Sequence, residues 1–287
     1  QMADMINMSR LSNGVRAAGL MRRALNESLH VAAHRTAFGR TLIEMPLMQR
    51  QLMKMLLPAE AARAMFMQIA LLLPQADAGD EQAARCVRIL TPLIKFRACR
   101  DARRVTGDAM EVRGGTGYIE EWSDARVVRD AHLGSIWEGT SNIVALDVAR
   151  AAQREQALDA LRTFLSDRLG AAPLPDASRA ALRRILARAC DALARVAAAG
   201  DDACVRQAAS ALYYASAAVL MACEGVRLAP DYRRLALAHL IVRHKLLPVD
   251  PFAPASRDDE AMAFDALVRG TPVPLDMALD LLPEVER

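Results

Sequence analysis

The sequence predicts an all-α protein: a four-helix up-down bundle followed by a C-terminal helical extension. Aromatic residues make up 4% of the 287 residues, whereas Ala, Leu, Arg and Met are abundant, and this balance favours helix over strand. Apolar residues also recur every three or four positions over long stretches, as they do on the buried face of a helix. With 53% hydrophobic and 25% charged residues, the composition is typical of a soluble globular protein with a large core.

Three long segments carry this period and are predicted as helices: residues 3–33, 44–73 and 81–112. In the first, Gly14 and Gly19 each lower helix propensity by roughly 1 kcal/mol but leave room for another helix to approach closely. Pro58 and Pro92 are predicted to kink the second and third helices. Residues 73–80, rich in Pro, Asp and Gly, are predicted to form a turn.

The next part of the chain completes the predicted bundle. Residues 114–135 are rich in Gly and charge and are predicted as a loop with at most one short turn. Residues 141–152 begin a fourth helix, which 153–169 continue or follow. Residues 170–176 have the composition of a linker. The predicted organisation is therefore a bundle over residues 1–169, a linker over 170–176, and a helical extension over 177–287.

The extension is predicted to contain five helical segments: 177–199, 203–226, 231–246, Asp258 to about Arg269, and a last turn or two from Asp276. Residues 247–254 contain three prolines and interrupt the helical pattern. Neither half is strongly charged, since residues 1–150 carry a net charge of +4 and the remainder carry −1. Charge alone therefore does not indicate a nucleic-acid-binding protein.

Several classes of protein are disfavoured by simple counts. There is no uninterrupted apolar run of about 18 residues, so no membrane span is predicted, and the expected location is cytoplasmic. The five cysteines are scattered and form no CxxC pair, as is usual for reduced thiols in the cytosol. His30 and His34 have a metal-compatible spacing, but no third ligand is evident, and no metal site is predicted.

The segment that points most directly to chemistry is Ile136–Asn142. It places Glu138 between Trp137 and a Gly-Thr-Ser turn, just before the predicted fourth helix. The hydroxyls of Thr140 and Ser141 are good helix caps, so the carboxylate is expected at a fixed chain corner, as suits a general base. On this segment alone, a surface glutamate before a helix remains the simpler interpretation.

Three other segments change that balance. They are Arg35–Gly39 (RTAFG), Glu111–Tyr118 (EVRGGTGY) and Val127–Ala131 (VVRDA). In this order and at these spacings, and together with Ile136–Asn142, they resemble the C-terminal helical domain of the acyl-CoA dehydrogenase flavoproteins. The matching family patterns are R-x-x-F-G, Q-x-x-G-G-x-G-aromatic, R-D-A, and aromatic-E-G-T-S/N. The resemblance covers about residues 1–152.

This resemblance implies an FAD-dependent oxidoreductase that converts an acyl-CoA thioester to its α,β-unsaturated product. Glu138 matches the catalytic base, and Arg10 and Gly139 match positions at the substrate. Some relatives place the base on the first long helix, where this chain has Ser9, which cannot serve. An electron-transfer flavoprotein or a similar acceptor is implied, as is a homo-oligomer, either a dimer or a tetramer.

The resemblance also assigns residues to the cofactor: Arg35, Phe38, Gly114, Gly115, Thr140 and Asn142. Arg35 matches the arginine that reaches the FAD pyrophosphate, usually across a subunit boundary. The glycine pair matches the approach to the adenosine part from a neighbouring subunit, although a helix end followed by a turn explains it equally well. Glu111 stands where the family has Gln, and Met45-Pro46 stand where it has His-Gln, so those contacts are not carried over.

Two alternatives remain open. Family members carry an N-terminal helical domain and a middle β-domain that these 287 residues lack, and residue 1 is Gln. The chain is therefore expected to be a fragment that is inactive in isolation. The alternative is that it is merely a helical assembly module. An extension after the fourth helix resembles the very-long-chain members or the adaptive-response branch, flavoproteins that protect DNA from alkylation with little dehydrogenase activity. The wording of residues 117–121 and 135–139 resembles the adaptive-response branch more closely. The extension has five arginines suited to a basic face: Arg179, Arg183, Arg184, Arg188 and Arg195. A solvated helix face is the simpler interpretation of that set.

Overall fold

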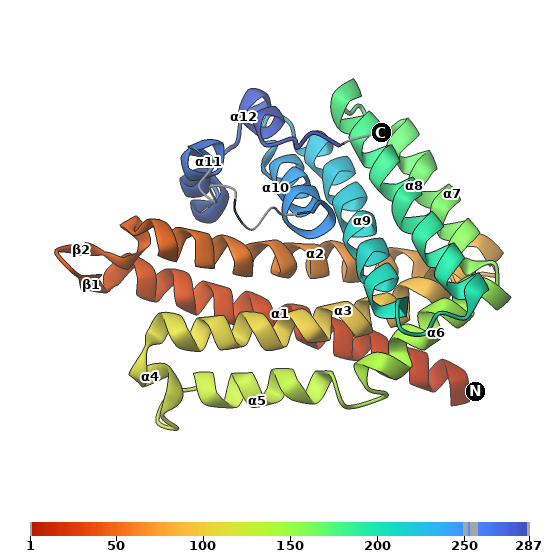
Figure 1. Ribbon diagram of the computed structural model, residues 1–287, viewed down its shortest axis with the longest axis horizontal. Coiled ribbons are helices and arrows are strands. Elements are labelled where there is room, and N and C mark those ends of the chain that lie inside the picture. The colour runs from red at the N-terminus through yellow and green to blue at the C-terminus, as the bar shows by residue number, and fades with distance from the viewer. Residues whose placement is uncertain (1, 249–251, 253–257, 286–287) are drawn as a thin grey trace.

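Three long helices run side by side through the body of the protein (Figure 1): α1 (Met2–His34), α2 (Pro46–Asp77) and α3 (Glu81–Arg113). The computed structural model describes residues 2–248, 252 and 258–285. Over these residues the fold is all-α apart from one short hairpin, as predicted, and the three predicted long helices are confirmed. Both α2 and α3 continue as helices through Pro58 and Pro92.

The close helix contact that was predicted at small residues occurs at one glycine and not at the other. A Cβ atom on Gly14 would lie 3.0 Å from both Cγ1 and Cγ2 of Ile94 on α3, so α1 and α3 approach closely there. A Cβ atom on Gly19 would meet nothing within 4 Å. Of these two glycines, Gly14 therefore allows the close packing of α1 on α3 and Gly19 does not take part in it.

The predicted turn over 73–80 begins too early. Helix α2 continues through Pro74 to Asp77, and the Pro74 carbonyl accepts a bond from Ala78 N at 3.1 Å at the end of the helix. The reversal occurs at Ala78 and Gly79, where Gly79 has φ +96°. Asp80 then caps α3, since its side chain accepts a bond from Ala83 N at 3.0 Å.

The prediction of a loop over 114–135 is wrong. This region contains α4 (Gly115–Tyr118) and an 11-residue helix, α5 (Asp124–Gly134), which lies along α1 and α3 (Figure 1). Its buried residues Ala125, Val127 and Ala131 pack inward, so tertiary burial outweighs the local loop signals. Gly134 allows the approach, because a Cβ atom there would lie 3.3 Å from Cys99 Sγ.

A short hairpin between α1 and α2 was not predicted. β1 (Thr36–Ala37) and β2 (Arg40–Thr41) pair antiparallel, with Thr36 opposite Thr41, and a 3₁₀ turn, η1 (Leu42–Glu44), follows. Phe38 and Gly39 at the tip both have positive φ, +52° and +80°, as a tight two-residue hairpin requires.

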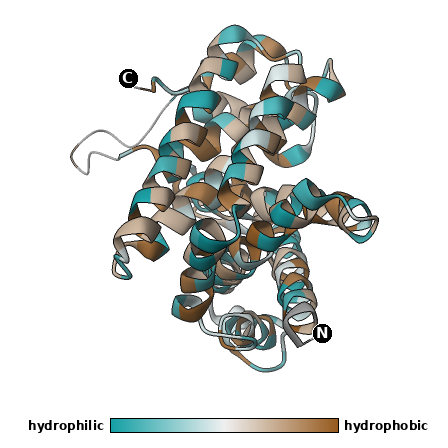
Figure 2. Cartoon of the chain, turned by 90° about the vertical axis from the view of Figure 1, so that its right-hand side faces the viewer, coloured by the Kyte–Doolittle hydropathy of each residue, from teal (hydrophilic) through white to brown (hydrophobic). Residues whose placement is uncertain are grey.

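The later helices cross the long ones at a steep angle, with α7 to α10 stacked against the bundle (Figures 1 and 2). Their bounds are α6 (Ser141–Arg154), α7 (Ala157–Ala171), α8 (Asp176–Ala199), α9 (Val205–Gly225), η2 (Val226–Leu228), α10 (Arg233–Ile241), η3 (Val242–Leu246), α11 (Asp258–Arg269) and α12 (Leu275–Asp280). All the predicted helical segments from residue 141 onward are confirmed. Most of the irregular stretch predicted at 247–254 lies outside the described residues.

The predicted linker is a short connection in which two residues are buried. Ala172 and Leu174 are 3% and 4% exposed, and Arg179 fixes the connection by donating to the carbonyls of Leu169, Gly170, Ala172 and Leu174 at 2.6–3.2 Å. Buried residues from both sides of it belong to one hydrophobic cluster. The division into a bundle and an extension as separate domains stays a prediction.

A buried carboxylate ties the extension to the long helices. Glu60 on α2 is fully buried and pairs with Arg22 of α1 at 2.6 Å and with Arg234 of α10 at 2.8 Å. Burial alone would raise the pKa of Glu60, but the surrounding arginines outweigh it and hold that pKa below its usual range.

Two described helical segments are long and apolar enough to cross a membrane by composition: Pro46–Asp77 and Val205–Leu228. In this fold, 67% and 83% of their most apolar windows are buried, so both act as core helices.

The two glycines of α1 give a matched test of this packing. Gly14→Val should lower the free energy of unfolding by about 1–3 kcal/mol, because the added methyl groups overlap Ile94. Gly19→Val, on the exposed side of the same helix, should change it by less than about 0.5 kcal/mol. Urea unfolding of the two variants measures the difference, and equal losses would show that the α1–α3 contact is not tight.

Candidate functional site at the Glu138 corner

Glu138 lies at a sharp corner between α5 and α6. Its φ is +55° and that of Gly139 is +101°, so two consecutive residues have left-handed backbone conformations. This conformation is unfavourable for a residue with a side chain and persists only where the surroundings impose it. A Cβ atom on Gly139 would also lie 3.3 Å from Val144 Cγ2, so glycine is required there. The Glu138 side chain is half-buried, as expected for a group that must reach a ligand.

Cationic side chains from two long helices hold the backbone of this corner. Lys95 of α3 donates from Nζ to the Gly139 carbonyl. Arg10 of α1 donates from Nε to the Glu138 carbonyl at 3.5 Å, at the outer limit of a hydrogen bond. The corner therefore depends on residues that are distant in the sequence.

Asp147, one and a half turns into α6, connects Arg10 to the rest of the site. Its carboxylate accepts from Arg10 Nη1 at 2.7 Å and from Arg88 Nη2 and Nη1 at 2.9 and 3.2 Å. Burial would raise the pKa of Asp147, but the hydrogen bonds and charge of Arg88, with those of Arg10, outweigh it and hold that pKa below its usual value. Asp147 is thus ionised and keeps Arg10 against the corner.

Lys95 is almost completely buried, with 1% of its surface exposed. Burial lowers the pKa of its ammonium group, and the charge of Arg10 lowers it further, whereas Cys99 and Glu138 act in the opposite direction. The ammonium and the Glu138 carboxylate therefore lie close enough to influence each other.

The start of α6 offers backbone donors beside Glu138. Thr140 is the N-cap, as predicted, but its side chain makes no capping bond, so the first amide groups of α6 are not satisfied by it. Such a helix start favours anions. Asn142 is engaged elsewhere, since its Oδ1 accepts from Arg206 of α9 at 3.2 Å.

The other predicted cofactor residues form a second group. Arg35 donates from Nη1 to the carbonyl of Arg113 at 2.9 Å, at the end of α3. Gly114 has φ +69°, and a Cβ atom on it would lie 3.3 Å from Arg35 Nη1, so the arginine and the glycine motif are in direct contact. Gly115 is exposed, and Phe38 is 96% exposed at the hairpin tip.

The hairpin and α4, beside the Arg35 group, lie at one end of the long helices, and the α5–α6 connection, which holds Glu138, lies toward the other end (Figure 1). Arg10 and Arg35 are 25 residues apart along α1 and its end, which is about 37 Å at the helical rise. The structure therefore brings Glu138, Gly139, Thr140 and Arg10 together, and Arg35 with Gly114, but does not bring the two groups to one place within a single copy.

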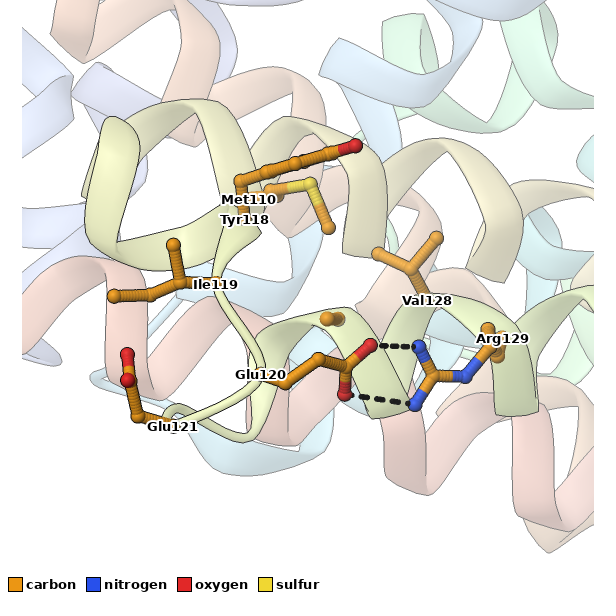
Figure 3. Close-up of a pocket in the computed structure, with 8 residues that line it drawn as sticks. Met110, Tyr118, Ile119, Glu120, Glu121, Val128 and Arg129 are labelled. Atoms are coloured by element: carbon orange, nitrogen blue, oxygen red, sulfur yellow. Dashed lines mark hydrogen bonds and ion pairs between the residues drawn. The ribbon is translucent and has the colours of Figure 1, made fainter.

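An open pocket of about 770 Å³ lies beside α4 (Figure 3). Its lining includes Met110, Tyr118, Ile119 and Val128, and one wall is the ion pair between Glu120 and Arg129, with contacts of 2.6 and 3.2 Å. This pocket adjoins the glycine motif and is not at the Glu138 corner.

Within the described residues, no cluster of three or more His, Cys, Asp or Glu side chains could hold a metal ion. The rings of His30 and His34 lie 4.4 Å apart, and His34 Nδ1 contacts the His30 carbonyl at 2.7 Å. Nδ1 of His34 is therefore engaged within its own helix.

Residues 1–153, more than half of the chain, match the family model described as "Acyl-CoA dehydrogenase, C-terminal domain". The chain belongs to the acyl-CoA dehydrogenase family. It is 38% identical over 152 residues to the putative acyl-CoA dehydrogenase AidB of Escherichia coli, and the matched residues cover 52% of this chain and 27% of AidB. It is 33% identical over 150 residues to acyl-CoA dehydrogenase family member 11 of Caenorhabditis elegans, covering 52% and 24%. The matched segment thus spans about a quarter of these relatives.

Solved structures show that the similarity of fold extends further along the chain. The C. elegans ACDH-11 structure, solved in complex with C11-CoA, has a TM-score of 0.78 at 24% identity and covers 94% of this chain and 48% of that one. An acyl-CoA dehydrogenase from Bacillus anthracis, complexed with FAD, has a TM-score of 0.67 at 18% identity and covers 98% and 55%. The extension is therefore part of a fold found in other members.

Sequence reasoning missed Lys95, Asp147 and Arg88. Each is a charged residue inside a helical apolar pattern, and Lys95 follows the apolar run Leu93-Ile94 and precedes Phe96. A lone charge within such a run was the available signal, because a buried charge needs a partner.

Asp147→Asn tests the network around the corner. The substitution should lower the free energy of unfolding by about 3 kcal/mol at pH 7, because it leaves the partly buried Arg10 without a carboxylate and leaves Arg88 with Glu155 alone. The stabilisation from a depressed carboxyl pKa is present above the unfolded-state pKa and is lost as pH falls through the folded-state value. The difference from wild type should therefore shrink in acid. Asp159→Asn, on the exposed face of α7, serves as the control, and equal unfolding curves for the two variants would contradict the assignment.

Proposed function

We propose that this chain carries the base and part of the FAD site of an acyl-CoA dehydrogenase that acts on acyl-CoA thioesters. The observation that supports this most directly is the Glu138 corner, where a half-buried carboxylate is held in an unfavourable backbone conformation by two helices. A general base must be fixed within hydrogen-bond reach of the proton it takes.

In this proposal, the Glu138 carboxylate removes the α-proton of the thioester. The bound flavin supplies the acceptor for the hydride that leaves the β-carbon. Arg10 and Gly139 belong to the wall beside the reacting carbons. Arg10 acts there mainly by position, because its guanidinium is already paired with Asp147.

The residues present fit an FAD group in two separate respects. The uncapped amide groups at the start of α6, with Thr140 and the Nδ2 group of Asn142, suit the flavin end and its phosphate, since Arg206 uses only Oδ1 of Asn142. Arg35 uses Nη1 on the Arg113 carbonyl, and no bond to Nε or Nη2 occurs among the described residues, so a fork of donors remains for a pyrophosphate. Phe38, Gly114 and Gly115 adjoin that arginine.

Because the two groups are about 37 Å apart, one dinucleotide cannot contact both in the same copy. We infer a homo-oligomer in which the Arg35 end of one copy meets the Glu138 end of another through the cofactor. The exposed side chains of Phe38 and Leu47, which are 96% and 80% accessible, are consistent with a surface that another chain covers. An electron-transfer flavoprotein or a similar acceptor would complete the turnover.

A second candidate function, association with DNA with little dehydrogenase activity, is favoured by one observation. Arg100 and Arg103 of α3 lie near Arg206 of α9, and burial together with those charges lowers the pKa of Arg100. Three arginines, two from the bundle and one from the extension, thus lie near one another, although Arg179 of the predicted face is used on backbone carbonyls. Steep loss of duplex binding with added salt would favour this function, and no binding at low salt would remove it.

Glu138→Gln tests the enzymatic proposal. In the full-length gene product loaded with FAD, kcat for acyl-CoA oxidation should fall by roughly 10²–10⁴-fold, because the amide cannot take the α-proton. Glu121→Gln, at an exposed glutamate of the α4–α5 connection, should leave kcat unchanged. Turnover of the Glu138 variant within twofold of wild type would reject the assignment.

The shared cofactor site can be tested by mixing two inactive variants. Arg35→Met should weaken FAD retention, seen as lost flavin absorbance per chain, and should abolish turnover. When this variant is co-expressed with Glu138→Gln, random dimers should recover about a quarter of wild-type turnover, since one site of each mixed dimer is intact. If turnover is not recovered, Arg35 and Glu138 do not share a site between two copies: they serve one site within the same copy, or they serve different sites.

A further inference from the structure

Lys95 is one of only three lysines in the chain, and its position in the fold is unusual for a charged side chain. Residues 89–96 of α3 are buried without a break, so Lys95 has core neighbours on every side of the helix. The adjacent Ile94 and Phe96 are 0% and 2% exposed. Burying an ammonium group is costly unless it is paired and hydrogen-bonded.

The bond that Lys95 makes is to the Gly139 carbonyl, immediately after Glu138. Two peptide groups set the direction of the Glu138 side chain: the one between Glu138 and Gly139, and the one that follows Gly139. Both residues have left-handed backbone conformations. A donor fixed in the core of α3 therefore limits rotation at the corner. Arg10 contributes less, because its bond to the Glu138 carbonyl is 3.5 Å long and its guanidinium is mainly paired with Asp147.

We propose that Lys95 is a positioning residue that fixes the Glu138 carboxylate by holding the Gly139 carbonyl. Its effect on turnover rests on the proposed function of Glu138, whereas its effect on the corner does not. A misplacement of a reacting group by about 1 Å can cost roughly 100-fold in rate.

Burial of the Lys95 ammonium gives this role a pH dependence, because burial lowers its pKa. The charge of Arg10 on α1 lowers that pKa further, whereas Glu138 of the corner and Cys99 of α3, as a thiolate, act in the opposite direction. A buried ammonium loses its proton at lower pH than a free lysine, and the neutral amine is a weaker donor. Alkaline pH should therefore loosen the corner in the wild-type protein.

Lys95→Met tests the proposal, because methionine fills a similar volume without a donor. In the full-length protein with FAD, kcat should fall roughly 10- to 100-fold while KM changes by less than about threefold, since the substrate still binds but the base is misdirected. The alkaline loss of kcat seen in wild type should be absent from the variant. Lys54→Met, at an exposed lysine of α2, is the matched control and should behave as wild type.

Amide hydrogen exchange supplies a readout that needs no turnover. Peptides covering residues 134–142 should exchange faster in Lys95→Met than in Lys54→Met, with α2 unchanged in both. In wild type, the protection of the same segment should fall at alkaline pH once the intrinsic effect of pH on exchange is corrected for. This second measurement needs only the wild-type protein, so it can be made even if the variant does not fold. Unchanged protection in both measurements would overturn the proposal. If no acyl-CoA is oxidised by any form, the enzymatic proposal fails, and hydrogen exchange alone still decides whether Lys95 holds the corner.

Discussion

Burial of α3 constrains the rest of the protein. The helix packs against α1, α2, α5, α6, α7 and α9, and 18 of its 33 residues are buried. A polar group inside it must find a partner in the protein, because water is excluded. Asp101 pairs with Arg97 of the same helix and accepts a bond from the hydroxyl of Tyr214 on α9, and Lys95 donates to the Gly139 carbonyl before α6. The pairing needs of one helix therefore fix both where the extension sits and how the Glu138 corner is folded.

The helices that could be predicted are those in which local and tertiary signals agree. The segments that became α1, α3, α8 and α9 carry a long apolar period, and their ends coincide with caps or glycines such as Asp80 and Gly200. Helix α5 was not predicted, because Gly and charged residues surround it in the sequence and its stability comes from packing on α1 and α3. The hairpin at Thr36–Thr41 is too short to carry any period, so only the Phe-Gly pair at its tip marked it.

The candidate site was predictable as a set of motifs but not as a geometry. A sequence pattern states that Glu138, Arg35 and Gly114 occur, and it does not state that α1 separates them by most of the length of the bundle. The charged residues behind the corner were missed for a different reason. Lys95 and Asp147 stand alone within apolar helical patterns, where a solvated and a buried side chain have the same spacing, and only the packing of α3 and α6 distinguishes them.

The extension takes part in the structure of the site as well as in the core. Arg206 of α9 donates to Asn142 at the start of α6, and Arg234 of α10 pairs with the fully buried Glu60 on α2. Glu60 also pairs with Arg22, so α1 and the extension share one carboxylate. Loss of one of these guanidinium groups would leave a fully buried carboxylate with fewer hydrogen bonds and less compensating charge, which is costly. The extension therefore supports α1 and α6, the same two helices that carry Arg10 and Asp147 to the Glu138 corner.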